Sequence, residues 1–221
     1  MACGELEVRR NGLRISVELS NTKKLIDMKK IILSLTVMLM SLSTFAQAES
    51  PHLSFKGVPI DGTLDEYVQK MKRKGFDYLG TEDGIAILTG DFAAYKGCTV
   101  GVATLKQKDL VSKITVIFPN CETWAGLSNN YFSLKEMLTE KYGKPAEVTE
   151  KFQSYSEPRD DNSRMYEVKM DRCKYVTIFE TPKGDIQLYI GHNSMMSCYV
   201  MLSYFDKVNG DVVRSQAMDD L

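Results

Sequence analysis

Cysteines are the residues of this chain best suited to covalent chemistry. Five are present: Cys3, Cys98, Cys121, Cys173 and Cys198. The last four make an even number, and an even number of cysteines in an oxidising compartment is typical of a disulfide framework. The alternative is that these thiols stay reduced and are buried as small hydrophobic side chains.

The spacing of two cysteines predicts how they pair. Strands expected at 99–106 and 111–118 are joined by a short turn, and Cys98 and Cys121 lie at equal distances from that turn. Residues placed in this way face each other in an antiparallel hairpin, with Cα atoms about 4.5–5.5 Å apart, which suits a disulfide. We therefore expect one disulfide between them and, by elimination, a second between the remaining two cysteines.

Other reactive constellations are weak. His192 lies six residues from Cys198, but a thiol committed to a disulfide cannot act as a nucleophile. The sequence lacks the C-x-x-C and H-x-x-x-H spacings of zinc sites and the glycine-rich motifs of phosphate-binding loops. The acidic segment 157–162 lacks the spacing of a calcium loop and is predicted to be solvated. We expect no catalytic residue, metal or cofactor.

A segment near the start of the chain sets the compartment. Within residues 28–48, two lysines precede an apolar run at 31–40, and Ala46-Gln47-Ala48 follows. This order is typical of a secretory signal peptide, so we expect cleavage after Ala48 and a periplasmic or secreted protein. The alternative is an uncleaved anchor, which needs ~20 predominantly apolar residues.

Residues 1–27 precede that segment and are polar with mixed charge, which indicates a start codon assigned too far upstream. Removing the seven basic and four acidic residues of 1–48 leaves 21 basic and 25 acidic residues in 173, a net charge of −4. This length fits one domain. The mild acidity does not match a nucleic-acid binder, and we expect no membrane span after cleavage.

Sequence patterns predict an α+β domain over 49–206. Thr63-Leu64-Asp65-Glu66 is a capping box, and apolar side chains then recur at helical spacing as far as Gly75. We therefore expect a helix at 64–74, whose last turn carries solvated lysines. The apolar period then changes to two, which indicates strands at 76–80, 85–92, 99–106 and 111–118.

A second helix is predicted at about 122–142, with the sole tryptophan, Trp124, as a core anchor at its start. A competing interpretation starts this helix after Ser133, which opens a capping box of its own. Residues 207–221 are expected to form a polar tail. Five more strands are predicted at 146–152, 164–170, 174–181, 186–192 and 198–205.

The order of these elements is doubled. A capped helix, a glycine and strands occur at about 60–119 and again at about 120–206, with the two capping boxes 70 residues apart. We interpret this as a tandem duplication of a helix-plus-antiparallel-sheet unit. The helices would cover one face of a shared sheet, which gives a two-layer sandwich.

This element order resembles the β-lactamase-inhibitor-protein-like fold, in which each of two tandem units begins with helix and continues with four antiparallel strands. A related single-unit form occurs in small outer-membrane-assembly lipoproteins. Locally, Phe55–Gly62 and Glu140–Pro145 resemble uncharacterised exported proteins of gut anaerobes. The resemblance implies a fold, and it carries no target-binding residue over to this chain.

The C-terminal strands carry Tyr175, Tyr189, Tyr199 and Tyr204. Tyrosines are common in sheets, but an exposed set of them is also typical of a surface that grips a partner. We expect an exported, non-enzymatic binding module that uses an open aromatic sheet face, with another envelope or extracellular protein as its partner. The alternative is a hydrolase-like periplasmic enzyme whose site is assembled from dispersed residues.

Overall fold

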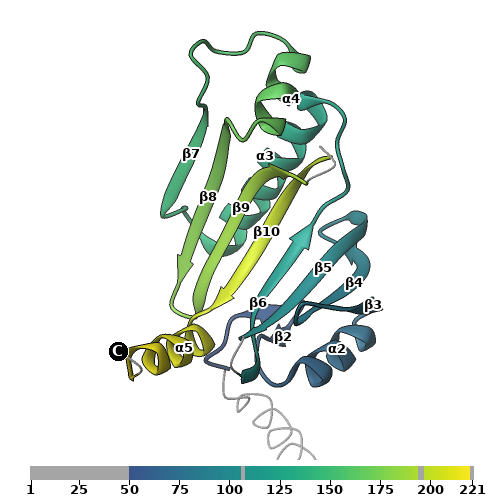
Figure 1. Cartoon of the computed structure of the whole chain (residues 1–221), viewed down its shortest axis with the longest axis vertical. Helices are drawn as coiled ribbons and strands as arrows, with labels where there is room; N and C mark the ends of the chain where they lie inside the picture. The colour runs from purple at the N-terminus through teal and green to yellow at the C-terminus, as the bar shows by residue number, and fades with distance from the viewer. Residues whose placement is uncertain (1–49, 106–107, 194–196, 220–221) are drawn as a thin grey trace, which may run out of the picture. The chain divides into compact units, whose positions relative to one another are not determined.

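A large antiparallel sheet dominates the fold (Figure 1). The structure is a computed structural model and describes residues 50–105, 108–193 and 197–219. The predicted upstream extension and signal peptide, within residues 1–48, lie outside the described residues and stay predictions. Over the described part of the chain, the sheet and four helices confirm the expected α+β class.

Neighbouring strands of the sheet run antiparallel throughout. In spatial order they are β3 (Asp77–Glu82), β4 (Ile85–Phe92), β5 (Tyr95–Leu105), β6 (Lys108–Ile117), β10 (Cys198–Asp206), β9 (Gly184–His192), β8 (Cys173–Thr181) and β7 (Glu147–Phe152). The first four and the last four each form a meander of consecutive strands. The two meanders join at a seam where β6 pairs with β10.

Four helices and a small hairpin complete the described chain. The hairpin consists of β1 (Ser54–Phe55) and β2 (Val58–Pro59), and the helices are α2 (Leu64–Arg73), α3 (Trp124–Tyr142), α4 (Asp161–Lys169) and α5 (Lys207–Asp219). Eight of the nine predicted strands are confirmed, with small shifts at their ends. The ninth, at 164–170, is wrong because these residues belong mainly to a helix.

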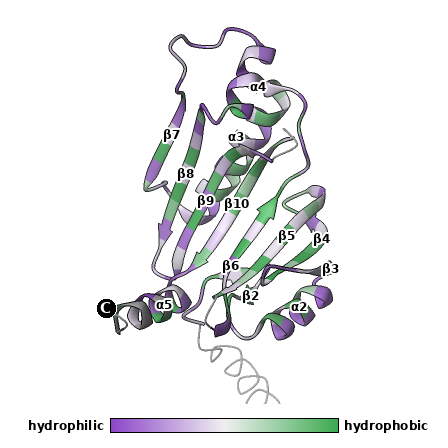
Figure 2. Cartoon of the chain, in the orientation of Figure 1, coloured by the Kyte–Doolittle hydropathy of each residue, from purple (hydrophilic) through white to green (hydrophobic). Residues whose placement is uncertain are grey.

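One side of the sheet forms the core. A row of directly paired residues crosses five strands there, and each is at most 1% exposed: Val100, Val116, Leu202, Leu188 and Thr177. Helix α3 packs on this side, behind β8 to β10 in Figure 1. Hydrophobic and hydrophilic residues alternate along the strands (Figure 2), as a sheet with one buried side requires.

The lead-in segment before α2 also contributes to the core. Phe55 is 1% exposed and packs its ring against Phe76, Phe92 and Tyr204, with ring centroids 6.0, 4.9 and 5.5 Å away. Phe76 directly precedes β3 and Phe92 ends β4, both at the first meander, whereas Tyr204 belongs to β10. The segment therefore links both meanders through aromatic contacts.

Helix α2 confirms the predicted capping box. The Thr63 hydroxyl accepts a hydrogen bond from the Glu66 N–H, and the Glu66 carboxylate accepts one from the Thr63 N–H, both at 3.4 Å. The helix ends before Gly75, whose φ of +88° is the left-handed conformation that glycine adopts without strain. Lys70, Lys72 and Arg73 lie in the last turn, where cations suit the helix dipole.

Helix α3 begins at Trp124, so the longer of the two interpretations is confirmed and the start after Ser133 is wrong. Thr123 caps the helix, and its hydroxyl accepts the Gly126 N–H. Trp124 is 7% exposed and contacts Phe152 and Tyr175, which confirms it as a core anchor. Buried apolar residues upstream of Ser133 stabilise this longer helix.

The segment predicted as a strand at 164–170 forms most of α4 instead. Asp160 caps this helix by accepting the Ser163 N–H at 2.8 Å, and Met165 and Val168 are buried three residues apart. Apolar residues alternate with polar ones within 165–170, which favours a strand. The N-cap at Asp160 and the helical spacing of the buried residues favour a helix, and the helix forms. The acidic segment is thus solvent-exposed for the most part, as expected, but its last residues form the cap and the first turn of a helix.

The expected polar tail is also wrong over the described residues, because Lys207–Asp219 forms α5. Asp206, the last residue of β10, accepts the Asn209 N–H at 2.9 Å, as an N-cap residue does. Asn209 is only 3% exposed. The composition of this segment is polar, but its first turn is anchored in the core.

Gly184 provides a sharp test of this arrangement. Its φ is +146°, and a Cβ at this position would overlap the carbonyl oxygen of Phe205 on the paired strand. We expect Gly184→Ala to lower the free energy of unfolding by more than about 2 kcal/mol, measured by urea denaturation. Gly210→Ala is the control: it meets open space within α5 and should be neutral or stabilising by up to about 1 kcal/mol. Equal effects would contradict the β9–β10 packing.

Candidate functional site

The side of the sheet opposite the core carries an apolar row. Ile117, Met201, Tyr189 and Val176 are directly paired across β6, β10, β9 and β8, and each is partly exposed. Tyr199 lies on the same side, two residues before Met201 on β10. We call these five residues the open-side stripe. They form a continuous apolar and aromatic surface across the seam.

Two tyrosines of the stripe are held in place by their surroundings. Their rings lie over Gly191, where an added Cβ would be 3.3 Å from the Tyr189 ring and 3.7 Å from the Tyr199 ring. The Tyr189 hydroxyl donates to the Met201 sulfur at 3.3 Å, and the Tyr199 hydroxyl donates to the His192 carbonyl oxygen at 3.2 Å. Burial raises the pKa of both phenols, so both remain hydrogen-bond donors at neutral pH.

The other two predicted tyrosines are not part of this surface. Tyr204 is 3% exposed and packs against Phe55 in the core. Tyr175 lies on the core side of β8, where its ring contacts Trp124 and Tyr131 of α3. The prediction of one four-tyrosine face is wrong because side chains alternate between the two sides of a strand, and these positions have the parity of the buried side.

The predicted pairing of Cys98 with Cys121 is also wrong in its register. Thr99 pairs with Ile117, which places Cys98 beside Phe118, three residues short of Cys121. Register shifts occur between Ala103 and Leu105, next to the turn. Because these bulges add residues to one strand only, equal distance from the turn does not put two residues opposite each other.

A bridge between Cys173 and Cys198 is blocked by the strand order. These cysteines lie on β8 and β10, and β9 runs between them. Two strand spacings amount to about 9.5 Å, which exceeds the limit of about 7 Å between the Cα atoms of a disulfide. The cysteines as a disulfide-forming set remain a prediction, but this pairing does not fit the sheet.

The structure brings His192 and Cys198 together as a cross-strand pair, but not as a nucleophile and its base. The His192 Nδ1 atom lies 2.8 Å from the Asn193 carbonyl oxygen, and Nε2 lies 3.1 Å from an oxygen of Asp171. Both ring nitrogens are therefore engaged elsewhere. Cys198 is 1% exposed, and burial raises the pKa of its thiol, whereas a catalytic cysteine needs an accessible thiolate.

A groove of about 1270 Å³ lies between α4 and the segment that precedes it, within residues 153–172. Two of its charged groups, Glu167 and Arg172, form an ion pair. Arg172 donates two hydrogen bonds to Glu167, at 2.7 and 2.9 Å, and these hold the pKa of the Glu167 carboxyl below its ordinary value. Hydrogen bonds from Ser163 likewise lower the pKa of Asp160. A general acid needs the opposite shift.

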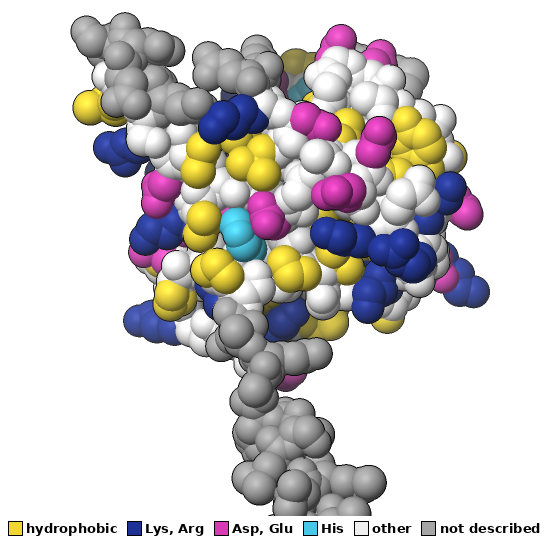
Figure 3. Space-filling view, turned by 90° about the horizontal axis from the view of Figure 1, so that it is seen from below, with side chains coloured by type: hydrophobic (Ala, Val, Ile, Leu, Met, Phe, Trp, Pro, Cys, Tyr) yellow, Lys and Arg dark blue, Asp and Glu magenta, His cyan; other side chains and the backbone are white. Residues whose placement is uncertain are grey.

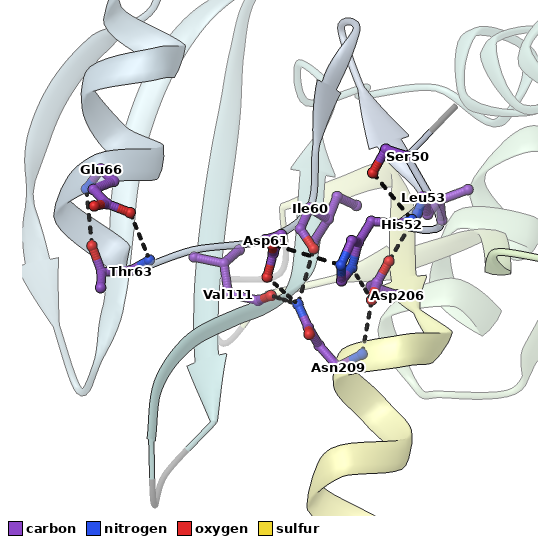
Figure 4. A network of polar contacts seen from close by, with 10 residues as sticks. All are labelled: Ser50, His52, Leu53, Ile60, Asp61, Thr63, Glu66, Val111, Asp206 and Asn209. Carbon is purple, nitrogen blue, oxygen red and sulfur yellow. Dashed lines mark hydrogen bonds and ion pairs between the residues drawn. The ribbon is translucent and has the colours of Figure 1, made fainter. Parts of the chain in front are cut away.

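A buried polar cluster joins the lead-in segment to the start of α5 (Figure 4). The Asp206 side chain is fully buried; one oxygen lies 3.0 Å from His52 Nδ1 and the other accepts the Leu53 N–H at 2.8 Å. Asn209 donates from its side-chain amide to the carbonyl oxygens of Ile60 and Val111. In the view from below, a histidine lies between acidic and hydrophobic side chains at the surface (Figure 3).

This cluster has the composition of a catalytic pair but the contacts of a structural joint. His52 Nε2 lies 3.6 Å from a carboxylate oxygen of Asp61. The imidazole therefore faces a second carboxylate and not a nucleophile. Its members are up to 154 residues apart in sequence. No local motif reveals it, and its one sequence signal is the N-cap preference of aspartate at position 206.

The acidic segment 157–162 also has a role that the sequence did not reveal. Asp161 accepts the Trp124 and Ala125 N–H groups, both at 3.0 Å, and so satisfies two donors at the start of α3.

Among the described residues, no group of three or more His, Cys, Asp or Glu side chains is arranged to hold a metal ion. None of the helices described by the structure is long and apolar enough to cross a membrane.

No protein-family model, curated protein or solved structure matches this chain. A function must therefore be inferred from the surfaces described above. Of these, the open-side stripe combines exposure with a fixed geometry, whereas the polar clusters use their hydrogen-bonding groups internally.

The buried cluster predicts a large effect of one substitution. Asp206→Ala would leave the Leu53 and Asn209 N–H groups without their acceptor, so we expect the free energy of unfolding to fall by roughly 2–4 kcal/mol in chemical denaturation. Asp185→Ala, at an exposed position on β9, is the control and should stay within about 0.5 kcal/mol of the unchanged protein. A mild effect at Asp206 would mean that the cluster is not formed.

The Glu167–Arg172 pair predicts a pH dependence. Because the folded-state pKa of Glu167 is depressed, the pair contributes stability above the ordinary glutamate pKa of about 4.3, and that contribution is lost as pH falls through the folded-state value. Thermal melts between pH 3 and 7 should show a smaller loss of Tm at low pH for Glu167→Gln than for the unchanged protein. Glu140→Gln, outside this pair, should leave the profile unaltered. Identical profiles for all three proteins would contradict the pairing.

Proposed function

We propose that this chain is an exported, non-enzymatic binding module that holds another envelope or extracellular protein on its open side. The observation that carries the proposal is the open-side stripe, a partly exposed apolar row across four consecutive strands. Tyrosine and methionine are enriched at protein interfaces, where their large side chains become fully desolvated. The proposed compartment rests on the signal-peptide pattern at 28–48.

The dimensions of the sheet suit a protein partner. Eight strands with seven spacings span about 34 Å, and nine-residue strands are about 30 Å long, which gives about 1,000 Å². A standard interface uses about 800 Å² on each partner. Because the stripe is apolar, and only Tyr189 and Tyr199 add hydroxyl groups to it, we infer that the partner presents a hydrophobic segment and not a charged one.

We also propose that the domain consists of two tandem repeats in a two-layer sandwich, as in the β-lactamase-inhibitor-protein-like fold that it resembles. The order helix, then four strands occurs as α2 with β3 to β6 and as α3 with β7 to β10. Both helices are followed by a glycine with positive φ, Gly75 and Gly143. The caps at Thr63 and Thr123 support a spacing of 60 residues in place of 70.

The alternative, a hydrolase-like enzyme, has the groove beside α4 as its candidate site. The groove belongs to the second meander only, because α4 is inserted between β7 and β8. Two of its carboxylates, Asp160 and Glu167, accept hydrogen bonds that lower their pKa values, so these two are poorly suited to donate a proton near neutral pH. The open-side stripe is therefore the better supported site.

The two sites can be separated with matched tyrosine pairs. We expect Tyr189→Ala with Tyr199→Ala to weaken partner binding at least about 100-fold, because two central aromatic anchors are removed. Tyr155→Ala with Tyr166→Ala is the control: these tyrosines are 109% and 54% exposed and line the groove. Proteins captured from an envelope extract of the source cells by the unchanged protein are identified, and their Kd for each variant is measured by calorimetry.

A captured protein that binds the stripe variant as tightly as the unchanged protein would contradict the proposal. Loss of binding in the groove variant alone would assign the site to the groove instead. Circular dichroism and thermal melts of both variants must match the unchanged protein, because all four positions are at least partly exposed.

A further inference from the structure

Two cysteines face each other at one end of the seam. Cys121 lies four residues after the end of β6, and Cys198 is the first residue of β10. They form an antiparallel bridge in which the Cys121 N–H donates to the Cys198 carbonyl oxygen at 2.8 Å. Opposed residues in such a pair have Cα atoms about 4.5–5.5 Å apart, within the disulfide span of about 4.4–6.8 Å, and their side chains project to the same side.

We propose that Cys121 and Cys198 form a disulfide that joins the two meanders across the seam. Each thiol loses one proton and one electron as the S–S bond forms. The disulfide of an oxidant, such as glutathione disulfide, is broken and takes up both electrons and both protons to become two thiols. The other cysteines do not compete, because Cys98 lies beside Phe118 and β9 separates Cys173 from Cys198.

The surroundings of the two thiols indicate the order of events. Cys121 is partly exposed, and its sulfur accepts a hydrogen bond from the Asn130 amide at 3.2 Å. Cys198 is 1% exposed. An oxidant therefore forms a mixed disulfide with Cys121 first. The Cys198 thiol then attacks the Cys121 sulfur and releases the oxidant's half as a thiol. Burial raises the pKa of both thiols, which lowers the fraction of reactive thiolate and slows the reaction.

The bond would also hold the proposed binding surface. Ile117 and Met201, directly paired members of the open-side stripe, lie close to the two cysteines in sequence: Ile117 ends β6 four residues before Cys121, and Met201 follows Cys198 by three residues on β10. A disulfide at this end fixes the register of β6 against β10, and with it the alignment of these two side chains. The disulfide itself does not depend on the proposed function, because its geometry comes from the sheet alone.

Peptide mapping tests the pairing directly. The purified full chain is equilibrated with reduced and oxidised glutathione, alkylated, and digested with trypsin without reduction. Trypsin places the cysteines in separate peptides, namely 97–106 for Cys98, 114–135 for Cys121, 173–174 for Cys173 and 184–207 for Cys198, and Cys3 lies in 1–9. We expect 114–135 joined to 184–207, at a mass two hydrogens below their sum. A different joined pair, or alkylation of both Cys121 and Cys198, overturns the proposal.

Thermal melts of serine variants provide the second readout. Oxidation should raise the Tm of the unchanged protein, Cys98→Ser and Cys173→Ser by about 10 °C, because the bond closes a loop of 77 residues. Cys121→Ser should show no rise. Cys198→Ala should behave like Cys121→Ser, and if its buried position prevents folding, the partly exposed Cys121 variant still decides the matter. A Tm rise that survives in Cys121→Ser contradicts the proposal.

Discussion

The pairing of β6 with β10 is the interaction on which the rest of the structure depends. Without it, each meander would end in an unpaired edge strand rich in apolar residues, which is a site for aggregation. The register also assigns every side chain near the seam to one side of the sheet. Val116 and Leu202 enter the core, whereas Ile117 and Met201 form the open side. A slip of one residue would exchange the two sets.

The two sides of the sheet then have different roles. The core side is closed by α2, α3 and the aromatic contacts of Phe55, which bind both meanders into one hydrophobic cluster. On the open side, the apolar row stays partly exposed. Stability and the proposed binding function are thus separated by the alternation of side chains along the same strands.

The polar groups of this domain mostly complete its secondary structure. Asp160, Asp161 and Asp206 each accept backbone N–H groups at a helix start, where the helix leaves its first donors without partners. Carboxylates used in this way are held in place by backbone hydrogen bonds, so their first role is to complete the helices.

The sequence by itself determined the α+β class, the capped helix α2, the start of the long helix in its preferred interpretation, and eight strands, because caps, glycine stops and apolar period are local properties. Its patterns predicted a strand in place of α4 and a tail in place of α5, because these two helices lie in short polar segments. It could not find the His52–Asp206–Asn209 cluster, which joins segments distant in sequence. Tertiary structure alone decided which tyrosines face outward and which cysteines meet, because bulges and strand order set register, and register is a property of the whole sheet.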